Sequence, residues 1–327
     1  MNEKLLVIED LVTRFHTEDG VVKAVDGNSL HVGQRETLGI VGESGSGKTV
    51  TALSVMRLIE NPGRIERGSI RFMRSDLLKI SEKEMQAIRG KAIAMVFQDS
   101  LSSLNPTLTI GEQIGRVLRF HTKLSSKEIR KRTVDLLTQV GIPEPVKRAS
   151  NYPHEFSGGM RQRALIAMAI SCNPALLILD EPTTALDVTI EAQVFELVDA
   201  LKASYGMGTI LITHDLAVVA TSCVRVIIMY AGRIVEEAGV DDLYERPLHP
   251  YTRGLLNSIP RLDDSMPTRL YSIPGEVPDL ISLPDGCNFS PRCRYATDTC
   301  RRDEPRVEDV GQGRFVACLR VNEIDEL

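Results

Sequence analysis

The 327-residue chain contains no tryptophan, and aromatic residues make up only 5% of it. Proteins that bind nucleic acid usually have aromatic side chains on which bases stack, or clustered positive charge that contacts the phosphate backbone. Here the net charge is −5, and acidic and basic residues are interspersed along the sequence. The composition therefore argues against a nucleic-acid surface, and we expect no nucleic acid among the partners.

Long apolar runs are also missing. The first ten residues hold only four consecutive apolar positions, whereas a secretory signal core needs about 7–15 and a membrane span about 20. The run Val224–Ala231 is short and contains Arg225. We therefore expect a soluble, cytosolic protein, which could still dock on a membrane protein through its side chains.

The six cysteines include no C-x-x-C pair, so the usual structural zinc patterns fit poorly. In a reducing compartment, disulfides are not expected. Cys287, Cys293, Cys300 and Cys318 crowd the C-terminal part of the chain, with gaps of five, six and seventeen residues. Four thiolates in a region of little apolar content indicate a metal clip that stabilises a small core. Such soft donors suit an iron–sulfur cluster as well as zinc, and a site without metal remains an alternative.

Short apolar runs recur along the chain, and their length is typical of β-strands. Several lack polar alternation, as expected for strands buried on both faces of a parallel sheet. These runs are Leu5–Ile8, Leu38–Val41, Ile93–Phe97, Leu176–Leu179, Ile210–Thr213 and Val226–Met229. Helical patterns separate some of them: Thr189–Lys202 has one-face apolar spacing, and a capping box at Ser125–Glu128 leads another helix. The predicted fold class is therefore α/β.

The spacing of these runs predicts the domain organisation. About 130 residues separate the Gly-rich stretch 42–49 from the strand at 176–179, far more than one crossover needs. Helical patterns fill much of that gap, which predicts a helical subdomain at about 100–172, inserted into a domain of residues 1–240. Nine of the 16 prolines follow residue 241, so residues 241–327 are predicted to be a small irregular region.

The stretch GESGSGKT at residues 42–49 matches G-x-x-x-x-G-K-[ST] and lies between an apolar run and an amphipathic stretch. Its glycines allow the backbone to curl so that N–H groups point inward, and the following helix adds its positive dipole end. Lys48 can reach the β- and γ-phosphates of a nucleotide, and the Thr49 hydroxyl can bind Mg²⁺. We therefore predict a nucleotide phosphate site here.

Two further stretches carry chemistry of the same kind. In ALLILDEPTTALD (175–187), Asp180 and Glu181 follow a buried strand, at the edge where parallel sheets bind ligands. Asp180 suits the Mg²⁺ shell, and Glu181 suits a general base that polarises water. In FSGGMRQR (156–163), Ser157 can cap a helix, and Gly158 and Gly159 permit close approach to an anion. The chain thus has two motifs suited to binding phosphate, at 42–49 and at 156–163, and the presence of both requires an explanation.

These motifs, with Ala185-Leu186-Asp187 and a strand ending at His214, resemble the ATPase cassette of ABC transporters over residues 1 to about 240. The resemblance implies a P-loop NTPase fold, with a RecA-like mixed sheet and an inserted helical subdomain, that binds ATP and Mg²⁺. The resemblance also explains why one chain has two phosphate-binding motifs. In this family two cassettes pair head to tail, and each ATP is clamped between one phosphate loop and the partner's Ser-Gly-Gly.

The resemblance assigns roles residue by residue. The nucleotide-binding loop comprises Gly42, Glu43, Ser44, Gly45, Ser46, Gly47, Lys48 and Thr49. Gln98 would join Thr49 and Asp180 near the metal and sense the membrane subunits, although a plain polar strand end is the alternative. Glu181 and His214 would be catalytic, with His214 contacting the γ-phosphate, and Asp187 would couple the two sites. Phe15 would stack on adenine, unless it is a core residue. Phe156 and Met160 depart from the commonest Leu and Gln of this motif.

The C-terminal region resembles one subfamily of ABC transporters in particular. ERPLHPYTRGLL (245–256) and CNFSPRC (287–293) resemble the tail of the oligopeptide/dipeptide importer subfamily, with dipeptide-permease ATPase subunits the nearest. Nickel, glutathione and oligosaccharide importers share such tails, so the cargo stays open. The subfamily resemblance favours a [4Fe–4S] cluster on the four cysteines. It also implies a second, paralogous cassette in a heterodimer, two membrane permeases, an indirect solute-binding protein, and a peripheral location at the cytoplasmic face of the membrane.

Two rival interpretations remain. One is a soluble ABC ATPase of translation or repair, although such proteins usually carry two cassettes in one chain or a long coiled coil. The other is a non-hydrolysing nucleotide- or iron-sensing module, which would keep the phosphate loop but tolerate loss of Glu181. Co-purification with membrane proteins and an ATPase assay distinguish these alternatives.

Overall fold

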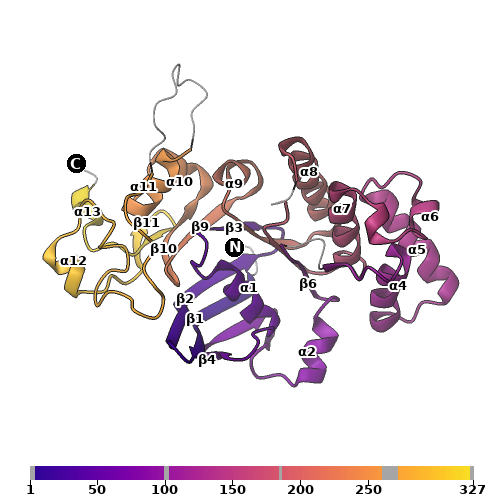
Figure 1. Ribbon diagram of the computed structural model, residues 1–327, viewed down its shortest axis with the longest axis horizontal. Coiled ribbons are helices and arrows are strands. Elements are labelled where there is room, and N and C mark those ends of the chain that lie inside the picture. The colour runs from indigo at the N-terminus through magenta and orange to yellow at the C-terminus, as the bar shows by residue number, and fades with distance from the viewer. Residues whose placement is uncertain (1–3, 99–102, 184–185, 260–271, 325–327) are drawn as a thin grey trace, which may run out of the picture. The chain divides into compact units, whose positions relative to one another are not determined.

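A computed structural model describes residues 4–98, 103–183, 186–259 and 272–324 (Figure 1). The chain forms two compact units. Unit 1 comprises Met1–Leu6, Val32–Thr37 and Phe72–Ile212, and unit 2 comprises Val7–His31, Leu38–Arg71 and Thr213–Leu327. The domain boundaries expected at residue 240 and around 100–172 stay a prediction.

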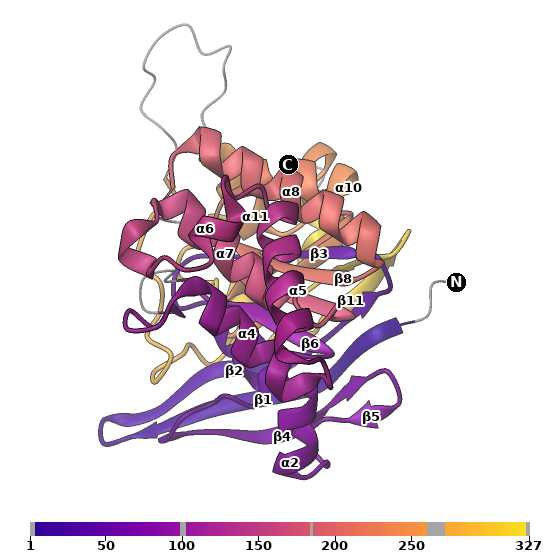
Figure 2. The same cartoon turned by 90° about the vertical axis from the view of Figure 1, so that its right-hand side faces the viewer.

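One sheet, formed largely by unit 2, contains three long strands. β1 (Lys4–Thr17), β2 (Gly20–Gly33) and β4 (Gly63–Phe72) lie side by side in the order β2-β1-β4 (Figure 2). Only the first part of β1 was predicted, as the run Leu5–Ile8. Along the rest of these strands, buried positions come at most three in a row between partly or fully exposed ones, so the apolar runs are too short to mark the strands.

A second set of unit 2 strands leads from the phosphate loop to the C-terminal region. β3 (Thr37–Val41) pairs in parallel with β9 (Arg225–Tyr230), and β9 pairs antiparallel with β10 (Arg233–Gly239). β10 continues antiparallel to β12 (Arg314–Val316), which pairs with β11 (Glu308–Gly311). The helices of this unit are α1 (Lys48–Met56), α9 (Leu216–Ser222), α10 (Val240–Glu245), α11 (Pro250–Asn257), α12 (Asp298–Arg302) and α13 (Val321–Ile324).

The core of unit 2 extends into the C-terminal region. Apolar residues of β9, including Val226 and Ile228, form one buried cluster with Tyr251 of α11 and Phe289. Glu236 of β10 is fully buried beneath this region, where it accepts hydrogen bonds from the backbone N–H groups of Leu248 and His249, both at 2.8 Å. Arg314 of β12 completes the ion pair at 3.3 Å. Among the described residues, the partners that satisfy this buried charge therefore come from the C-terminal region.

Unit 1 contains the parallel strands predicted from the apolar runs. β6 (Ile93–Val96), β7 (Leu176–Asp180) and β8 (Gly208–Thr213) are neighbours, and both pairs are parallel. Every residue of β7 and β8 is buried, which explains the absence of polar alternation. The predicted α/β class is confirmed. Two shorter elements, β5 (Ser75–Asp76) and α2 (Glu82–Ile88), precede β6.

The segment between β6 and β7 is helical. It contains α4 (Ile110–His121), α5 (Ser126–Gln139), α6 (Pro145–Arg148), the short 3₁₀-helix η1 (Pro153–Glu155) and α7 (Gly158–Ala169). α4, α5 and α7 contact one another, and α7 also contacts β6 and α8 (Val188–Tyr205) (Figure 1). The capping box predicted at Ser125 and Glu128 is confirmed, with both of its hydrogen bonds present.

None of the helices in the described parts of the chain combines the length and the apolarity that a membrane crossing requires.

Candidate functional site

The phosphate loop joins β3 to α1 in unit 2. Gly47 is the N-cap of α1, with a φ of 101° and no side-chain cap. A Cβ at Gly47 would lie 2.2 Å from the carbonyl oxygen of Ala24, and one at Gly42 would lie 2.2 Å from that of Met229. Only glycine fits such close backbone approaches. The first N–H groups of α1 are therefore presented on a tightly curved loop, the arrangement that binds phosphate.

Two side chains of the loop lie against its own backbone. Lys48 is 4% exposed, and its Nζ donates to the carbonyl oxygens of Gly42 at 2.7 Å and Glu43 at 3.0 Å. Ser46 is buried, and among the described residues its hydroxyl has no hydrogen-bond partner. Thr49, the predicted Mg²⁺ ligand, is exposed at the start of α1. The Lys48 ammonium group and the Ser46 hydroxyl are therefore held close to the loop that would surround a phosphate.

Residues of the C-terminal region fix the second position of this loop. Arg292 forms a bidentate ion pair with Glu43, at 2.7 Å from Nη1 and 3.1 Å from Nη2. The Glu43 N–H donates to the Tyr251 hydroxyl at 3.0 Å. The Glu43 carboxylate raises the pKa of Arg292 because it stabilises the charged guanidinium. Neither partner was predicted from the sequence. Both lie in the C-terminal stretches quoted above, but they are 208 and 249 positions away from Glu43, too far for a local pattern to pair them with it.

The Asp-Glu pair lies at the carboxyl end of β7 in unit 1. Asp180 is 1% exposed, and Glu181 follows it with a left-handed φ of 45°. That conformation is uncommon for a residue with a Cβ, and it is held by the Glu181 N–H bonding the Ile212 carbonyl at 2.9 Å. Gln98 Nε2 donates to Glu181 Oε2 at 2.8 Å. The structure thus brings Gln98 and Glu181 together, as expected if both act at one site.

The Ser-Gly-Gly stretch begins α7, also in unit 1. Ser157 is the exposed N-cap, and its hydroxyl accepts the Met160 N–H at 3.3 Å. A Cβ at Gly158 would be in ordinary contact with Leu186 at 3.4 Å, and one at Gly159 would lie 2.7 Å from Ile190. The segment after the Asp-Glu pair therefore packs directly against the two glycines.

The structure also shows where the other predicted nucleotide-site residues lie. Asp187 caps α8 and accepts the Ile190 N–H at 3.0 Å, whereas Ala185 lies outside the described residues. His214 is exposed directly after β8. Phe15 of β1 is half-buried, and a Cβ at Gly63 would lie 2.6 Å from its ring. The roles assigned to these side chains stay predictions.

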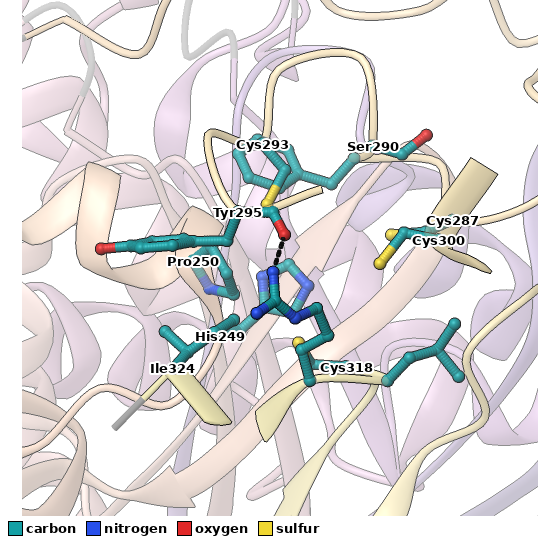
Figure 3. A pocket seen from close by; sticks show the side chains of 12 residues that line it. His249, Pro250, Cys287, Ser290, Cys293, Tyr295, Cys300, Cys318 and Ile324 are labelled. Carbon is teal, nitrogen blue, oxygen red and sulfur yellow. Dashed lines mark hydrogen bonds between the residues drawn. The ribbon is translucent and has the colours of Figure 1, made fainter. Parts of the chain in front are cut away.

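The four C-terminal cysteines line one cavity in unit 2, although they come from separate segments (Figure 3). The Cys287 N–H bonds the Cys300 carbonyl at 2.8 Å, and His249 lies among the cysteines in the same cavity. Burial raises the pKa of the Cys287 thiol to about 12 and that of the Cys318 thiol to about 11. Within the described ranges, however, no three His, Cys, Asp or Glu side chains are gathered closely enough to hold a metal ion.

Comparison with protein families and known proteins accounts for both parts of the chain. The ABC transporter family model matches residues 25–184, and the model of the oligopeptide/dipeptide transporter C-terminal region matches residues 235–300. The oligopeptide transport ATP-binding protein OppD of Bacillus subtilis is 51% identical over 96% of this chain and 88% of its own length. The chain belongs to the ABC transporter ATP-binding proteins. The family predicted from the motifs, including its oligopeptide/dipeptide type, is thereby confirmed.

Two further relatives of this ATP-binding protein agree with that assignment. The probable peptide ABC transporter ATP-binding protein y4tR of Sinorhizobium fredii is 49% identical over 99% of this chain and 97% of the relative. The dipeptide transport ATP-binding protein DppD of Haemophilus influenzae is 48% identical over 98% and 96%. The membership places the chain among ATPases that are coupled to transport.

A solved structure supports the fold of this ATP-binding protein. The dimeric bacterial ABC transporter cassette MJ0796 matches with a TM-score of 0.65 and 26% identity, over 72% of this chain and 98% of that chain. The predicted P-loop ABC cassette fold is confirmed.

Proposed function

We propose that this chain is the ATP-hydrolysing subunit of an importer for di- or oligopeptides. The peptide assignment is supported by the match to the oligopeptide/dipeptide C-terminal region and by the names of the relatives at 48–51% identity. The observation that carries the hydrolytic role is the strained Glu181, which follows the buried Asp180 and is bonded to Gln98. A carboxylate held in this way, in a chain with an intact phosphate loop, suits a general base.

The proposed reaction assigns one task to each residue. The N–H groups of the phosphate loop and Lys48 bind the β- and γ-phosphates, while Thr49, Asp180 and Gln98 are suited to the shell of Mg²⁺, which neutralises phosphate charge. Glu181 accepts a proton from water as the water oxygen bonds to the γ-phosphorus. The bond to the bridging oxygen breaks, and ADP leaves with that electron pair. His214 contacts the γ-phosphate, and Phe15 stacks on the adenine.

The proposed assembly places two cassettes head to tail. Ser157, Gly158 and Gly159 contact ATP bound by the partner, and Asp187 couples the two sites. The exposed Ser157 at the start of α7 supports this arrangement, as does the likeness to a dimeric cassette at 26% identity. The partner is a paralogous cassette, and the pair drives two membrane permeases served by a solute-binding protein. The subunit is peripheral, at the cytoplasmic face of the membrane.

We further propose that Cys287, Cys293, Cys300 and Cys318 hold a [4Fe–4S] cluster. Four thiols that face one buried cavity match the donor set of such a cluster, which would cross-link the C-terminal segments. Zinc, the alternative, requires every sulfur within ~2.3 Å of one ion. In a cluster each thiolate can bind a different iron, so the four sulfurs need not converge on one ion. Anaerobic purification should yield iron and visible charge-transfer absorbance; a chain that contains zinc or no metal would contradict the proposal.

Substitution of the proposed base tests the hydrolytic function. In Glu181→Gln, the amide cannot accept a proton, so we expect ATP turnover to fall by ~100-fold or more while ATP binding is retained. Glu196→Gln is the matched control, because Glu196 is an exposed carboxylate on α8 of the same unit. Turnover at the wild-type rate in Glu181→Gln would remove the base assignment. Co-purification with membrane permeases, and stimulation of turnover by peptides, test the transport role.

A further inference from the structure

The Arg292 side chain in the C-terminal region is buried and fully hydrogen-bonded. Its side chain is 5% exposed, and all three of its guanidinium nitrogens donate hydrogen bonds. Nε donates to the Pro274 carbonyl at 3.1 Å, and Nη2 to the Ile273 carbonyl at 3.4 Å. Nη1 approaches the Tyr230 hydroxyl at 3.4 Å, and both terminal nitrogens bind the Glu43 carboxylate. The guanidinium is thus fixed on one side by backbone carbonyls and directed at Glu43 on the other.

Glu43 is, in turn, held at three points. Arg292 binds its carboxylate, Tyr251 accepts its N–H at 3.0 Å, and its carbonyl accepts the Lys48 ammonium at 3.0 Å. Glu43 is the second residue of the phosphate loop, so its position sets the curvature of the loop and the place where the Lys48 amine rests. A bidentate, charge-assisted pair in a largely buried setting constrains geometry far more than an exposed pair does.

The segment that carries Arg292 is itself anchored. It lies between Cys287 and Cys293, and Phe289 of this segment packs on the rings of Tyr230 at 5.2 Å and Tyr251 at 5.4 Å. The same two tyrosines contact each other at 4.7 Å and provide the hydroxyls that meet Arg292 and Glu43. A continuous set of contacts within unit 2 therefore connects the cysteine-lined cavity to the phosphate loop.

We propose that Arg292 is a positioning residue for the phosphate loop and acts through Glu43. It holds the loop in its ATP-binding form before the nucleotide arrives, and the cysteine-bearing segment thereby contributes to ATP affinity. This inference rests on the proposed function. It differs from a general stabilising role because it concerns substrate binding: loss of the pair lowers the affinity for ATP more than it lowers the rate of hydrolysis once ATP is bound.

The test measures KM for ATP and kcat on the full chain assembled with its partner cassette, and equilibrium binding of a fluorescent ATP analogue on the full chain. For Arg292→Gln we expect KM to rise about tenfold, with kcat changed less than about twofold, and for Arg292→Lys an intermediate rise, because lysine cannot form the bidentate pair. Glu43→Gln should raise KM to a similar degree, and the double variant should be no worse than either single one. Additive effects, or a fall in kcat alone, would overturn the proposal.

Two controls separate positioning from folding. Arg301 forms an exposed ion pair with Asp298 at 2.9 Å in the same region, so Arg301→Gln should leave KM unchanged. Thermal unfolding is recorded for every variant. If Arg292→Gln fails to fold, Glu43→Gln and Arg292→Lys decide the matter, and wild-type KM in both refutes the inference. A wild-type chain without ATP binding would overturn the proposed function as well, whereas an active wild type with unchanged variants overturns the inference alone.

Discussion

The chain contains two glycine-rich helix starts that are suited to phosphate, and they are built in opposite ways. In unit 2, the N-terminus of α1 has no side-chain cap: Gly47 takes a φ of 101°, and Lys48 is buried against the loop. In unit 1, the N-terminus of α7 has a conventional cap, since Ser157 has a φ of −66° and bonds the Met160 N–H while exposed. The first depends on a backbone conformation that suits glycine and is enclosed, whereas the second has an ordinary backbone conformation and is exposed.

The two starts also differ in what holds them. The phosphate loop contacts three separate parts of unit 2, represented by Ala24, Met229 and Arg292. The neighbours described for the two glycines of the Ser-Gly-Gly stretch, Leu186 and Ile190, belong to one segment of unit 1. A loop fixed in advance loses little conformational freedom on binding, so it is suited to capture the nucleotide first. An open cap is suited to meet a nucleotide that is already bound elsewhere, which agrees with the proposed head-to-tail pair.

The largest effect is expected when the enclosed loop is broken. In Gly47→Ala, the new Cβ would lie 2.2 Å from the Ala24 carbonyl oxygen, and the backbone would stay in a left-handed conformation. The loop must shift to relieve this contact, so we expect ATP affinity to fall by ~100-fold or more. Titration with a fluorescent ATP analogue measures the change. The control is Gly45→Ala, whose φ of 78° is also strained but whose Cβ meets nothing within 4 Å; equal losses in the two variants would refute the steric explanation.

A smaller and different effect is expected at the open start. In Ser157→Ala, the cap of α7 is lost, which costs about 1 kcal/mol of stability. We expect turnover to fall about tenfold with ATP affinity unchanged, because the hydroxyl acts on the partner's nucleotide. Parallel measurements of kcat and ATP binding test this difference.

Gly158→Ala sharpens the contrast with Gly47→Ala. Its Cβ would make only ordinary contact with Leu186 at 3.4 Å, so the thermal unfolding temperature should stay within a few degrees of the wild type. If Ser157→Ala instead weakened ATP binding by the isolated chain, the idea that the two starts serve different nucleotides would be wrong.

The smallest effect concerns the ion pair that supports the phosphate-loop unit. Burial would raise the pKa of Asp26, but the Arg233 guanidinium at 2.6 Å, Arg14 and Lys23 together outweigh burial and lower that pKa below the usual value. Because the folded pKa is lower than the unfolded one, this contribution to stability is present above pH ~4 and is lost as the pH falls through the folded value. Urea unfolding between pH ~5 and ~3 should show a loss below about 1 kcal/mol that Asp26→Asn lacks. Identical pH profiles for the two proteins would contradict it.

Local patterns predicted the elements whose signal is local. The buried strands β3, β7 and β8 appear as unbroken apolar runs, and the Ser125 capping box marks the start of α5. The long strands β1 and β2 were only partly recognised, because their exposed positions carry polar residues and break the apolar runs. An unbroken run of apolar residues indicates a strand that is buried on both faces. The same signal is weak for a strand that has one face in solvent.

The candidate nucleotide site likewise has features that local sequence patterns predict and features that they do not. The motifs predicted Asp180 and Glu181 at the end of a buried strand and Lys48 at the start of the helix that follows another, and the structure has both, because strand and loop are adjacent in sequence. They gave no sign of the positive φ of Glu181 or of the contact between Glu43 and Arg292. Both depend on segments that meet only in the folded chain, so no spacing in the sequence encodes them.

The burial of Glu236 bears on how short a working version of this protein can be made. A truncation after residue 240 would remove Arg314 and the two peptide N–H groups that solvate this carboxylate, and would deprive Glu43 of its guanidinium. Two anions would then be left without compensation, one in the interior and one at the mouth of the nucleotide loop. The final quarter of the polypeptide thus supplies the partners of two acids in the nucleotide-binding part, and a shortened chain would need a neutral residue in place of Glu236 to avoid an unpaired charge in its interior.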